Sequence, residues 1–199
     1  MAQWEKLEQA LVRHGFAVSR FATGREAADY LDKKLDGRTV GMGGSVTLRE
    51  LGLYDRLAAH NTVHWHWSAE GPAARAAART AQVYLTSANA LAETGEIINI
   101  DGGGNRTAAM LDGHEAVYFV VGANKIAPDA AAALFRARNV AGPRNAQRLG
   151  RKTPCAARGE RCYDCDSPER VCGALVTLWR KPTGIPYAEV VLVEEELGY

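Results

Sequence analysis

The stretch VYFVVGANK, residues 117–125, joins an uninterrupted apolar run to a polar Gly-Ala-Asn-Lys turn. Five consecutive apolar residues, rich in β-branched and aromatic side chains, predict a strand that is buried on both faces. Such a strand is typical of a parallel sheet covered by helices on either side. Lys125 then follows the carboxyl end of the strand, which is the end where parallel sheets bind ligands.

On either side of this stretch, predicted strands alternate with predicted helices. Apolar and alternating runs predict strands over 38–42, 62–67, 83–86, 97–100, 175–179 and 190–193. Helical spacing predicts helices near 4–14, 24–35, 46–54, 73–81, 107–111 and 129–138. Because parallel neighbours need long return connections, the alternation predicts a Rossmann-like, three-layer α/β fold with one parallel sheet. The two C-terminal strands, at 175–179 and 190–193, are expected to complete this sheet.

Length and composition predict one domain over residues 1–199. The chain is 47% hydrophobic and 24% charged, which suits a single packed core. Its 24 basic and 23 acidic residues nearly cancel, so we expect no general attraction to nucleic acid or to a membrane. The first residues alternate charged with apolar side chains, unlike a signal segment, and we expect a cytoplasmic protein. Residues 139–172 are interpreted as a loop within the domain, rich in Cys and Arg.

The first candidate site is the glycine-rich turn after the strand at 38–42. Gly43 and Gly44 permit close backbone approach, and Ser45 can cap the helix that follows. Free N–H groups at a helix start favour a phosphate or a carboxylate. The alternative is a plain turn between strand and helix that needs glycine only for its backbone angles.

The second candidate site lies where polar residues follow several strands. We expect Asp101 to lie where a substrate would bind, and the ligand-binding candidates there are Asn89, Thr94, Gly103, Asn105, Arg106 and Asn124. Lys125 reaches the same edge of the sheet, where it can bind an anion or polarise a carbonyl. The alternatives are a turn in which Asp and Asn bond their own backbone, and a solvated surface lysine. His64 and His66, on one face of the predicted strand at 62–67, are interpreted as structural.

The third candidate site is a cluster of cysteines with the spacing C-x6-C-x2-C-x6-C. Four thiolates in so short a segment can close around one zinc ion or one iron-sulfur cluster. Free or redox-active thiols, and disulfides, stay open as alternatives. The proposed ligands are Cys155, Cys162, Cys165 and Cys172. The surrounding segment is strongly basic, which suits either an acidic partner or a solvated face.

Taken together, these motifs resemble the lactate-utilization family, in particular its C-type subunit and stand-alone relatives. The match runs from about Val40 to Cys172 and rests on GMGGSVTLRE (41–50), SANALAETGEIINIDGGGNR (87–106), VVGANKI (120–126) and TPCAARGERCYDCDSPERVC (153–172). The resemblance implies a fold similar to the sugar-phosphate isomerase and CoA-transferase superfamily. It also implies a part in oxidising L-lactate to pyruvate, usually beside iron-sulfur partner subunits.

By the same resemblance, Gly43, Gly44 and Ser45 match a phosphate- or CoA-binding loop. Asp101 and Lys125 would be acid, base or carbonyl-polarising groups. Glu93 would be a nucleophile like that of CoA transferases.

Three hypotheses about function follow. The preferred one is an accessory or electron-handling lactate-utilization protein, with a small anionic metabolite at the glycine-rich loop and the four cysteines as a metal or iron-sulfur site. A second is a stand-alone enzyme of sugar-phosphate or CoA-ester chemistry with a structural zinc. A third is a module that binds a small carboxylate. Catalytic activity of the chain alone is left open, and a homo-oligomer is compatible with the sequence.

Overall fold

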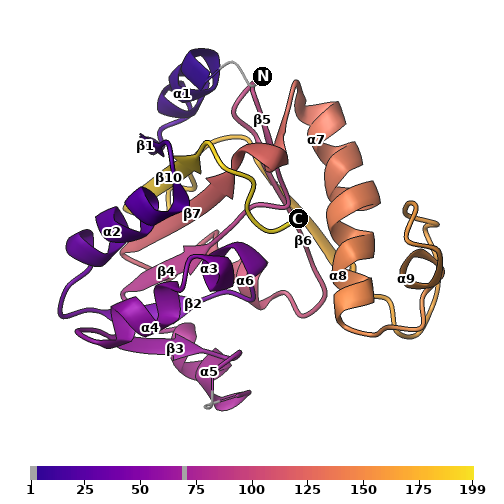
Figure 1. The fold of residues 1–199 in the computed structure, drawn as a ribbon, viewed down its shortest axis with the longest axis horizontal. Helices are drawn as coiled ribbons and strands as arrows, with labels where there is room; N and C mark the ends of the chain where they lie inside the picture. The colour runs from indigo at the N-terminus through magenta and orange to yellow at the C-terminus, as the bar shows by residue number, and fades with distance from the viewer. Residues whose placement is uncertain (1–3, 69–70) are drawn as a thin grey trace.

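The main sheet is a six-stranded parallel sheet, as the alternation of strands and helices predicts. The computed structural model describes residues 4–68 and 71–199. In spatial order the strands are β1 (Ala17–Phe21), β10 (Tyr187–Val193), β7 (Ala116–Gly122), β4 (Val83–Thr86), β2 (Thr39–Met42) and β3 (Thr62–Trp65). Every neighbouring pair in this sheet is parallel. The Rossmann-like α/β fold is therefore confirmed (Figure 1).

Strand β7 is central and contributes to two cores, because alternate side chains of a strand point to opposite faces. Tyr118 and Val120 pack into one hydrophobic core, and Val117, Phe119 and Val121 pack into the other. The first core lies beneath α2 (Gly24–Lys34), α3 (Val46–Glu50) and α4 (Leu53–Ala58). The second lies beneath α1 (Trp4–Arg13), α5 (Ala73–Ala78) and α6 (Asn105–Ala109). The run that predicted a doubly buried strand is thus buried at all seven positions of β7.

Helix boundaries follow local sequence signals. Thr23 and Glu26 form a capping box at the start of α2. The single helix expected over 46–54 is instead two short helices, α3 and α4. Gly52 separates them with a left-handed backbone, φ 61°.

A second, four-stranded sheet was not predicted. Its order is β8 (Ile126–Ala127), β5 (Ala90–Ala92), β6 (Ile97–Asp101) and β9 (Ala174–Leu178). Strand β6 pairs antiparallel with both β5 and β9. The expectation that 97–100 and 175–179 belong to one parallel sheet is therefore wrong, and of the two C-terminal strands only β10 enters the main sheet. The two C-terminal strands lie in different sheets.

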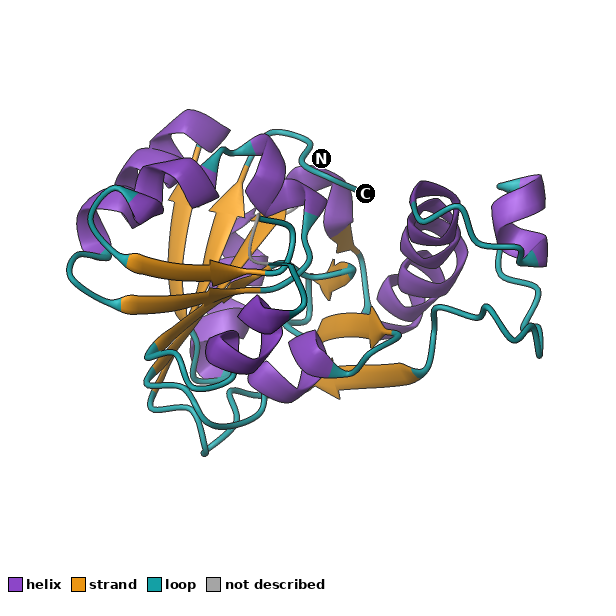
Figure 2. Cartoon of the chain, turned by 90° about the horizontal axis from the view of Figure 1, so that it is seen from below, coloured by secondary structure: helices purple, strands orange, loops and turns teal. Residues whose placement is uncertain are grey.

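The second sheet lies between the main sheet and a long helix (Figures 1 and 2). That helix runs from α7 (Ala130–Arg136) through a π-helical turn (Ala137–Ala141) into α8 (Gly142–Arg148). Pro143 lacks an N–H and would clash with a carbonyl in a regular α-helix, and the wider π turn just before it relieves that clash. Small side chains, Ala90 and Ala92 against Ala133 and Ala137, let the helix pack closely on the sheet.

The segment expected as a loop over 139–172 contains helices, with turns and irregular backbone at 149–153 and after residue 158. Residues Gly142–Arg148 and Pro154–Arg158 (α9) are helical, so the loop expectation is wrong for them. The loop prediction rested on proline and glycine, which usually interrupt helices. Here both prolines are tolerated, because Pro143 follows a π turn and Pro154 occupies the first helical position after the cap Thr153. Among the described residues, no helix combines the length and the apolar character that a membrane crossing needs.

Candidate functional site

Three parallel strands end at one small cavity, which we call the inner cavity. Ser45 follows β2, Ser87 follows β4 and Lys125 follows β7, and all three line a space of about 60 Å³. Its other lining residues are Gly44, Val46, Ala88, Asn89, Ile100, Arg106, Ala141, Gly142, Asn145, Val171 and Tyr199. The carboxyl ends of parallel strands therefore converge here, as they do at ligand sites of this fold class.

The glycine-rich turn serves close packing at this cavity. A Cβ atom on Gly44 would lie 3.2 Å from His66 and from Trp67, and one on Gly43 would lie 3.1 Å from Arg106. Ser45 caps α3 as expected, and its hydroxyl accepts a hydrogen bond from the Leu48 N–H at 3.3 Å. Since α3 spans only five residues, its dipole is small, and the charge at this site comes from side chains.

Lys125 is buried, with 3% of its surface exposed, so it is not the solvated lysine of the alternative interpretation. Its Nζ donates hydrogen bonds to Thr47 Oγ1 at 2.7 Å and to Ser87 Oγ at 2.9 Å. Within the described part of the chain, no carboxylate lies within 4.0 Å of Nζ. Burial, followed by repulsion from Arg136 and Arg106, lowers the pKa of Lys125 to about 7.

Two buried arginines add positive charge around the same residues. Arg106 donates to Asn99 Oδ1 at 2.5 Å and to the Ile100 carbonyl at 2.6 Å. Arg136 donates to the carbonyls of Asn89 at 2.5 Å and Asn124 at 2.8 Å. Burial lowers the pKa of both guanidinium groups, that of Arg136 to about 10. Over 4–68 and 71–199, neither guanidinium has a carboxylate within 4.0 Å.

Asp101 acts on the site through the backbone. Its carboxylate accepts hydrogen bonds from the N–H groups of Gly103 at 3.1 Å, Arg106 at 2.9 Å and Thr107 at 3.2 Å. It thereby fixes the start of α6, the helix that carries Arg106. This is the turn in which Asp bonds its own backbone, the alternative raised from the sequence. The structure thus gives Asp101 a positioning contact with Arg106, and its catalytic role stays a prediction.

A larger space, the outer cavity, adjoins the inner one and shares Gly44, Ile100, Arg106, Asn145 and Val171 with it. It measures about 450 Å³ and includes Asp101, Gly103 and Asn105. Among the described residues, five arginines and two carboxylates, Asp101 and Glu169, line it. The arginines are Arg75, Arg106, Arg148, Arg151 and Arg170. The guanidinium of Arg148 lies 4.6 Å from the centre of the Trp67 ring.

His66 lines the outer cavity, although the sequence favoured a purely structural role for it. Burial, followed by the charge of Arg75, lowers the pKa of His66 below its usual value. The ring is therefore largely neutral near pH 7, and it adds no charge to the arginines around it.

The C-terminal residues close the inner cavity. The Leu197 carbonyl accepts a hydrogen bond from Thr47 Oγ1 at 3.3 Å, and Tyr199 lines the cavity and donates to Asn145 Oδ1 at 2.8 Å. Asn124 holds this segment, since its side chain donates to the Gly198 carbonyl and accepts from the Leu197 N–H. Asn124 is thus committed to the C-terminal backbone and does not line either cavity.

The sequence profile of the LUD domain family matches residues 4–193 of the chain. The chain belongs to the LUD domain family. This family is associated with lactate utilization. The resemblance seen in the sequence is thereby confirmed at the level of the family.

A solved structure supports the fold of this LUD domain. The crystal structure of a DUF162 family protein from Deinococcus radiodurans superposes with a TM-score of 0.57 at 17% sequence identity. The alignment covers 96% of this chain and 95% of that one. At this identity the likeness concerns the fold alone. No curated protein matches the chain.

Two predicted site residues of the LUD domain lie elsewhere. Glu93 and Thr94 occupy the turn between β5 and β6, where Glu93 pairs with Lys6 of α1 at 3.4 Å and the Thr94 hydroxyl bonds the Glu96 carboxylate. Neither residue lines the inner or the outer cavity. The turn packs beside α1, so the structure does not bring the proposed nucleophile to Lys125.

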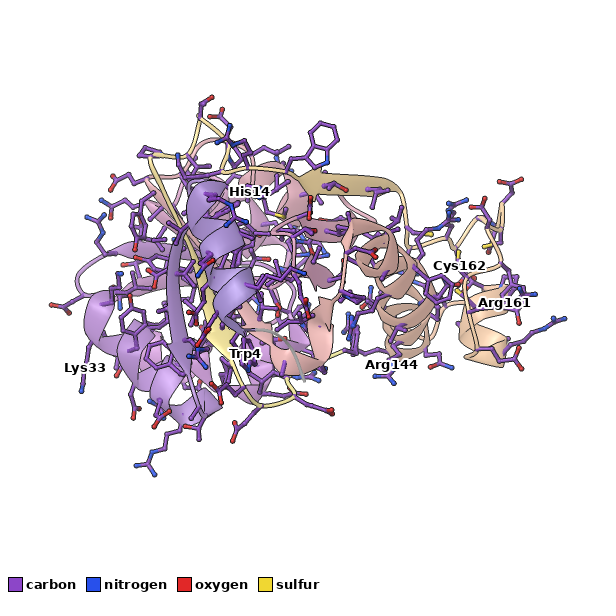
Figure 3. All side chains as sticks on the ribbon, turned by 90° about the horizontal axis from the view of Figure 1, so that it is seen from above. Trp4, His14, Lys33, Arg144, Arg161 and Cys162 are labelled. Carbon is purple, nitrogen blue, oxygen red and sulfur yellow. The ribbon has the colours of Figure 1, made fainter. Side chains whose placement is uncertain are left out.

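All four cysteines of the LUD domain line a third space, the cysteine cavity, of about 310 Å³. They are unoxidised and partly buried, on the segment that projects beyond α8, where Figure 3 labels Cys162. Cys172 Sγ accepts a hydrogen bond from Arg170 Nε at 3.1 Å, and Cys162 Sγ accepts one from the Asp164 N–H at 3.4 Å. The cysteine cavity shares Ile100, Gly142 and Val171 with the inner cavity, so the two candidate sites are neighbours.

The cysteine side chains do not form a metal centre as they stand. Outside residues 1–3 and 69–70, no group of three or more His, Cys, Asp or Glu side chains is arranged to hold a metal ion. The four thiols share a cavity without forming a ligand set, so neither zinc nor an iron-sulfur cluster is supported by this geometry. The proposed metal site therefore stays a prediction.

The most important residues that the sequence did not predict are hydroxyl and amide groups. Thr47 and Ser87 hold the Lys125 amine, and Asn99 holds the Arg106 guanidinium. Ser87 and Asn99 lie within the quoted motif 87–106, and Thr47 lies within the motif 41–50, two residues past the cap Ser45. A polar residue in an otherwise apolar strand, as Asn99 is in β6, was the available signal.

Proposed function

We propose that this LUD domain binds a small carboxylate of the 2-hydroxy or 2-oxo acid class, such as L-lactate or pyruvate, as an accessory component of lactate oxidation. One observation carries the proposal. Arg106, Arg136 and the Lys125 amine surround the Ser87–Asn89 turn, and within the described residues their nitrogen atoms donate only to neutral acceptors. Buried positive charge without a carboxylate is costly, and a bound anion offsets that cost.

The size of the inner cavity supports a small ligand. A cavity needs about 10–15 Å³ of such space for each water molecule. The inner cavity, at about 60 Å³, therefore holds on the order of four to six waters, which is room for a three-carbon acid. A CoA ester or a sugar phosphate exceeds this space, and its phosphates would have to occupy the outer cavity.

Binding is tested by thermal unfolding with L-lactate, pyruvate and the uncharged amide of lactate. At one hundred times Kd, a ligand of the folded state adds about 2.7 kcal/mol, which raises Tm by roughly 5–10 °C in a chain of this length. We expect that rise with either acid and none with the amide. Lys125→Met should remove most of it.

The matched control is Lys181→Met. Lys181 is also partly buried, and its Nζ donates to the carbonyls of Pro182 and Ile185, outside the inner cavity. This variant should keep the full shift. A wild-type protein whose Tm responds to neither acid, or a Lys125→Met variant that responds like the wild type, would contradict carboxylate binding in the inner cavity.

A second candidate function rests on the outer cavity. Its five arginines and the Arg148–Trp67 contact suit a phosphorylated ligand, as the hypothesis of a stand-alone sugar-phosphate or CoA-ester enzyme requires. CoA and sugar phosphates belong in the same thermal screen. A larger shift with these compounds than with the acids would favour the second candidate.

An electron-handling role depends on the cysteine cavity. Oxidation of L-lactate to pyruvate releases two electrons, and iron-sulfur partner subunits of the kind the resemblance implies would accept them. The shared residues Ile100 and Val171 support a role for the thiols beside the ligand. The Asp164 N–H and Arg170 Nε donate hydrogen bonds to the sulfur atoms of Cys162 and Cys172.

The metal prediction is tested on protein purified without oxygen. We expect one zinc ion or one iron-sulfur cluster per chain, measured by elemental analysis, acid-labile sulfide and visible absorption. Cys162→Ser combined with Cys165→Ser should release it, while Ser167→Ala in the same segment should not. Wild-type protein with four titratable thiols and no metal would reject the metal site and leave carboxylate binding untouched.

A further inference from the structure

The hydrogen bonds of Lys125 match a neutral amine better than an ammonium ion. Thr47 Oγ1 donates to the Leu197 carbonyl at 3.3 Å, and Ser87 Oγ lies 3.4 Å from Thr47 Oγ1 and 3.5 Å from the Ala88 carbonyl. Both hydroxyl hydrogens thus have an acceptor, and both oxygens are available to accept from Nζ. A neutral amine has two N–H groups for these two oxygens and keeps its lone pair.

The surroundings of Lys125 disfavour the protonated form. An ammonium ion has three N–H groups, and across 4–68 and 71–199 only two acceptors contact Nζ. The nearby charges of Arg106 and Arg136 repel a third cation, while Glu50 is the acidic group that opposes them at longer range. Burial and this repulsion give a pKa of about 7, so a large share of the amine is unprotonated at neutral pH.

An unprotonated lysine amine in a closed cavity is a nucleophile towards carbonyl carbon. Lys125 and Arg106 line the same cavity, so that one side chain can supply the attacking nitrogen and the other a positive charge for a carboxylate. Ser45 and Asn89 add polar groups on the walls. The inner cavity therefore contains both a nucleophilic amine and a positively charged group, which together can react with a ketone and bind the carboxylate next to it.

We propose that Lys125 forms an imine with the carbonyl carbon of a small 2-oxo acid bound in the inner cavity. The proposal rests on the proposed carboxylate binding and names its reactive subclass. Nζ attacks the carbonyl carbon, a C–N bond forms, and the carbonyl electron pair becomes a hydroxyl after taking up the amine proton. This hydroxyl takes up the second amine proton and leaves as water, which breaks the C–O bond and leaves a C=N bond without any net oxidation or reduction.

The two hydroxyl groups at Nζ fit the proton transfers of this reaction. Thr47 Oγ1 and Ser87 Oγ contact Nζ and each other, and each also lies near a backbone carbonyl, so they can pass a proton from the amine to the departing oxygen. A 2-hydroxy acid has no carbonyl carbon beside its carboxylate and binds without reacting. The site therefore distinguishes the oxidised acid from the reduced acid by covalent capture.

The test is reductive trapping of the full chain. Protein is incubated with pyruvate and then with sodium borohydride, which reduces an imine to a stable amine, and the intact mass and the peptide map are measured. We expect an added mass of one pyruvic acid molecule less one oxygen atom, located on Lys125. L-lactate should give no adduct, Lys125→Met should give none, and Lys181→Met should label like the wild type.

The peptide map of the wild type decides the question even where Lys125→Met fails to fold. Pyruvate that raises Tm yet leaves Lys125 unlabelled would overturn the imine while keeping carboxylate binding. Absence of both the shift and the adduct would overturn both proposals. A pyruvate adduct spread evenly over surface lysines would also contradict the imine proposal, because it would show no preference for the lysine in the inner cavity.

Discussion

Replacing Gly122 with alanine is expected to lower the free energy of unfolding by about 3 kcal/mol. An added Cβ would lie 2.7 Å from the Leu197 nitrogen, and 2.9 Å from both the Glu195 carbonyl oxygen and Asn124 Oδ1. Two of these three atoms are backbone atoms, which cannot rotate away. Gly122 ends the central strand β7 with an ordinary φ of −77°, so the cost arises from packing and not from backbone strain.

Urea unfolding measures this effect, with Gly142→Ala as the matched control. Gly142 has helical φ and ψ, −59° and −55°, and a Cβ there would meet its nearest neighbour at an ordinary 3.5 Å. The control should gain about 0.5–1 kcal/mol, because alanine favours a helix over glycine. If both variants lost the same free energy, close packing at Gly122 would not be the reason.

The Gly122 variant should also weaken ligand binding. The segment that a Cβ would displace carries Leu197, whose carbonyl holds Thr47, and Tyr199, which lines the inner cavity. The end of strand β7 therefore contributes to the site in two ways. Gly122 leaves space for the C-terminal segment to pack against the strand. Three residues later, Lys125 lines the inner cavity, which the same segment closes.

Five of the six strands of the main sheet were predictable because they carry their own signal, whereas β1 (Ala17–Phe21) was not predicted. The apolar run of β7 and the alternating residues of β3 identify strands without any knowledge of their neighbours. In the second sheet β6 and β9 were predicted as strands, but β5 (Ala90–Ala92) and β8 are only three and two residues long and carry no such signal. Such short segments have no measurable period, and only their packing against α7 makes them strands.

The candidate site was predictable where it depends on the ends of strands. Ser45 and Lys125 were placed at one edge of the sheet from the order of strands alone, and both line the inner cavity. Asp101 was expected on the same edge and instead lines the outer cavity, because its strand β6 belongs to the second sheet. Glu93 and Thr94 are far from both cavities for the same reason.

The partners of Lys125 could not be predicted from the sequence. Thr47 meets Lys125 only because the chain returns at Leu197, 150 positions later, to fix the threonine hydroxyl. Arg136 contributes charge only because the long helix packs on β5. The electrostatics of the inner cavity thus depend on contacts between segments that no local pattern connects.

The difference in stability between Lys125→Met and the wild type is expected to depend strongly on pH. In the folded protein the pKa of Lys125 is about 7, whereas in the unfolded chain a lysine titrates near 10.4. Between these values the unfolded chain binds the extra proton, so the free energy of unfolding of the wild type rises with pH across this window. The rise from this group alone is on the order of 4 kcal/mol.

Methionine removes this titration, because it fills similar space without an ionisable group. The variant should therefore be more stable than the wild type below pH 7, and that advantage should disappear as the pH approaches 10. Urea unfolding at several pH values, with the two proteins compared at each, cancels the titration of tyrosine and cysteine side chains. Parallel profiles would mean that the folded protein keeps Lys125 charged, and they would remove the nucleophile that imine formation needs.

Lys34→Met provides the opposite case. Lys34 donates to the buried carboxylate of Glu189 at 2.8 Å, and this pairing raises the pKa of Lys34 above its usual value, although burial opposes the shift. Its stabilising contribution is therefore complete below the pKa of the unfolded chain and is lost only above it. This variant should be destabilised by a constant amount from pH 7 to 9. Two lysines of one LUD domain should then show opposite signs of stability change at pH 7, because a carboxylate accompanies one amine and only hydroxyl groups accompany the other.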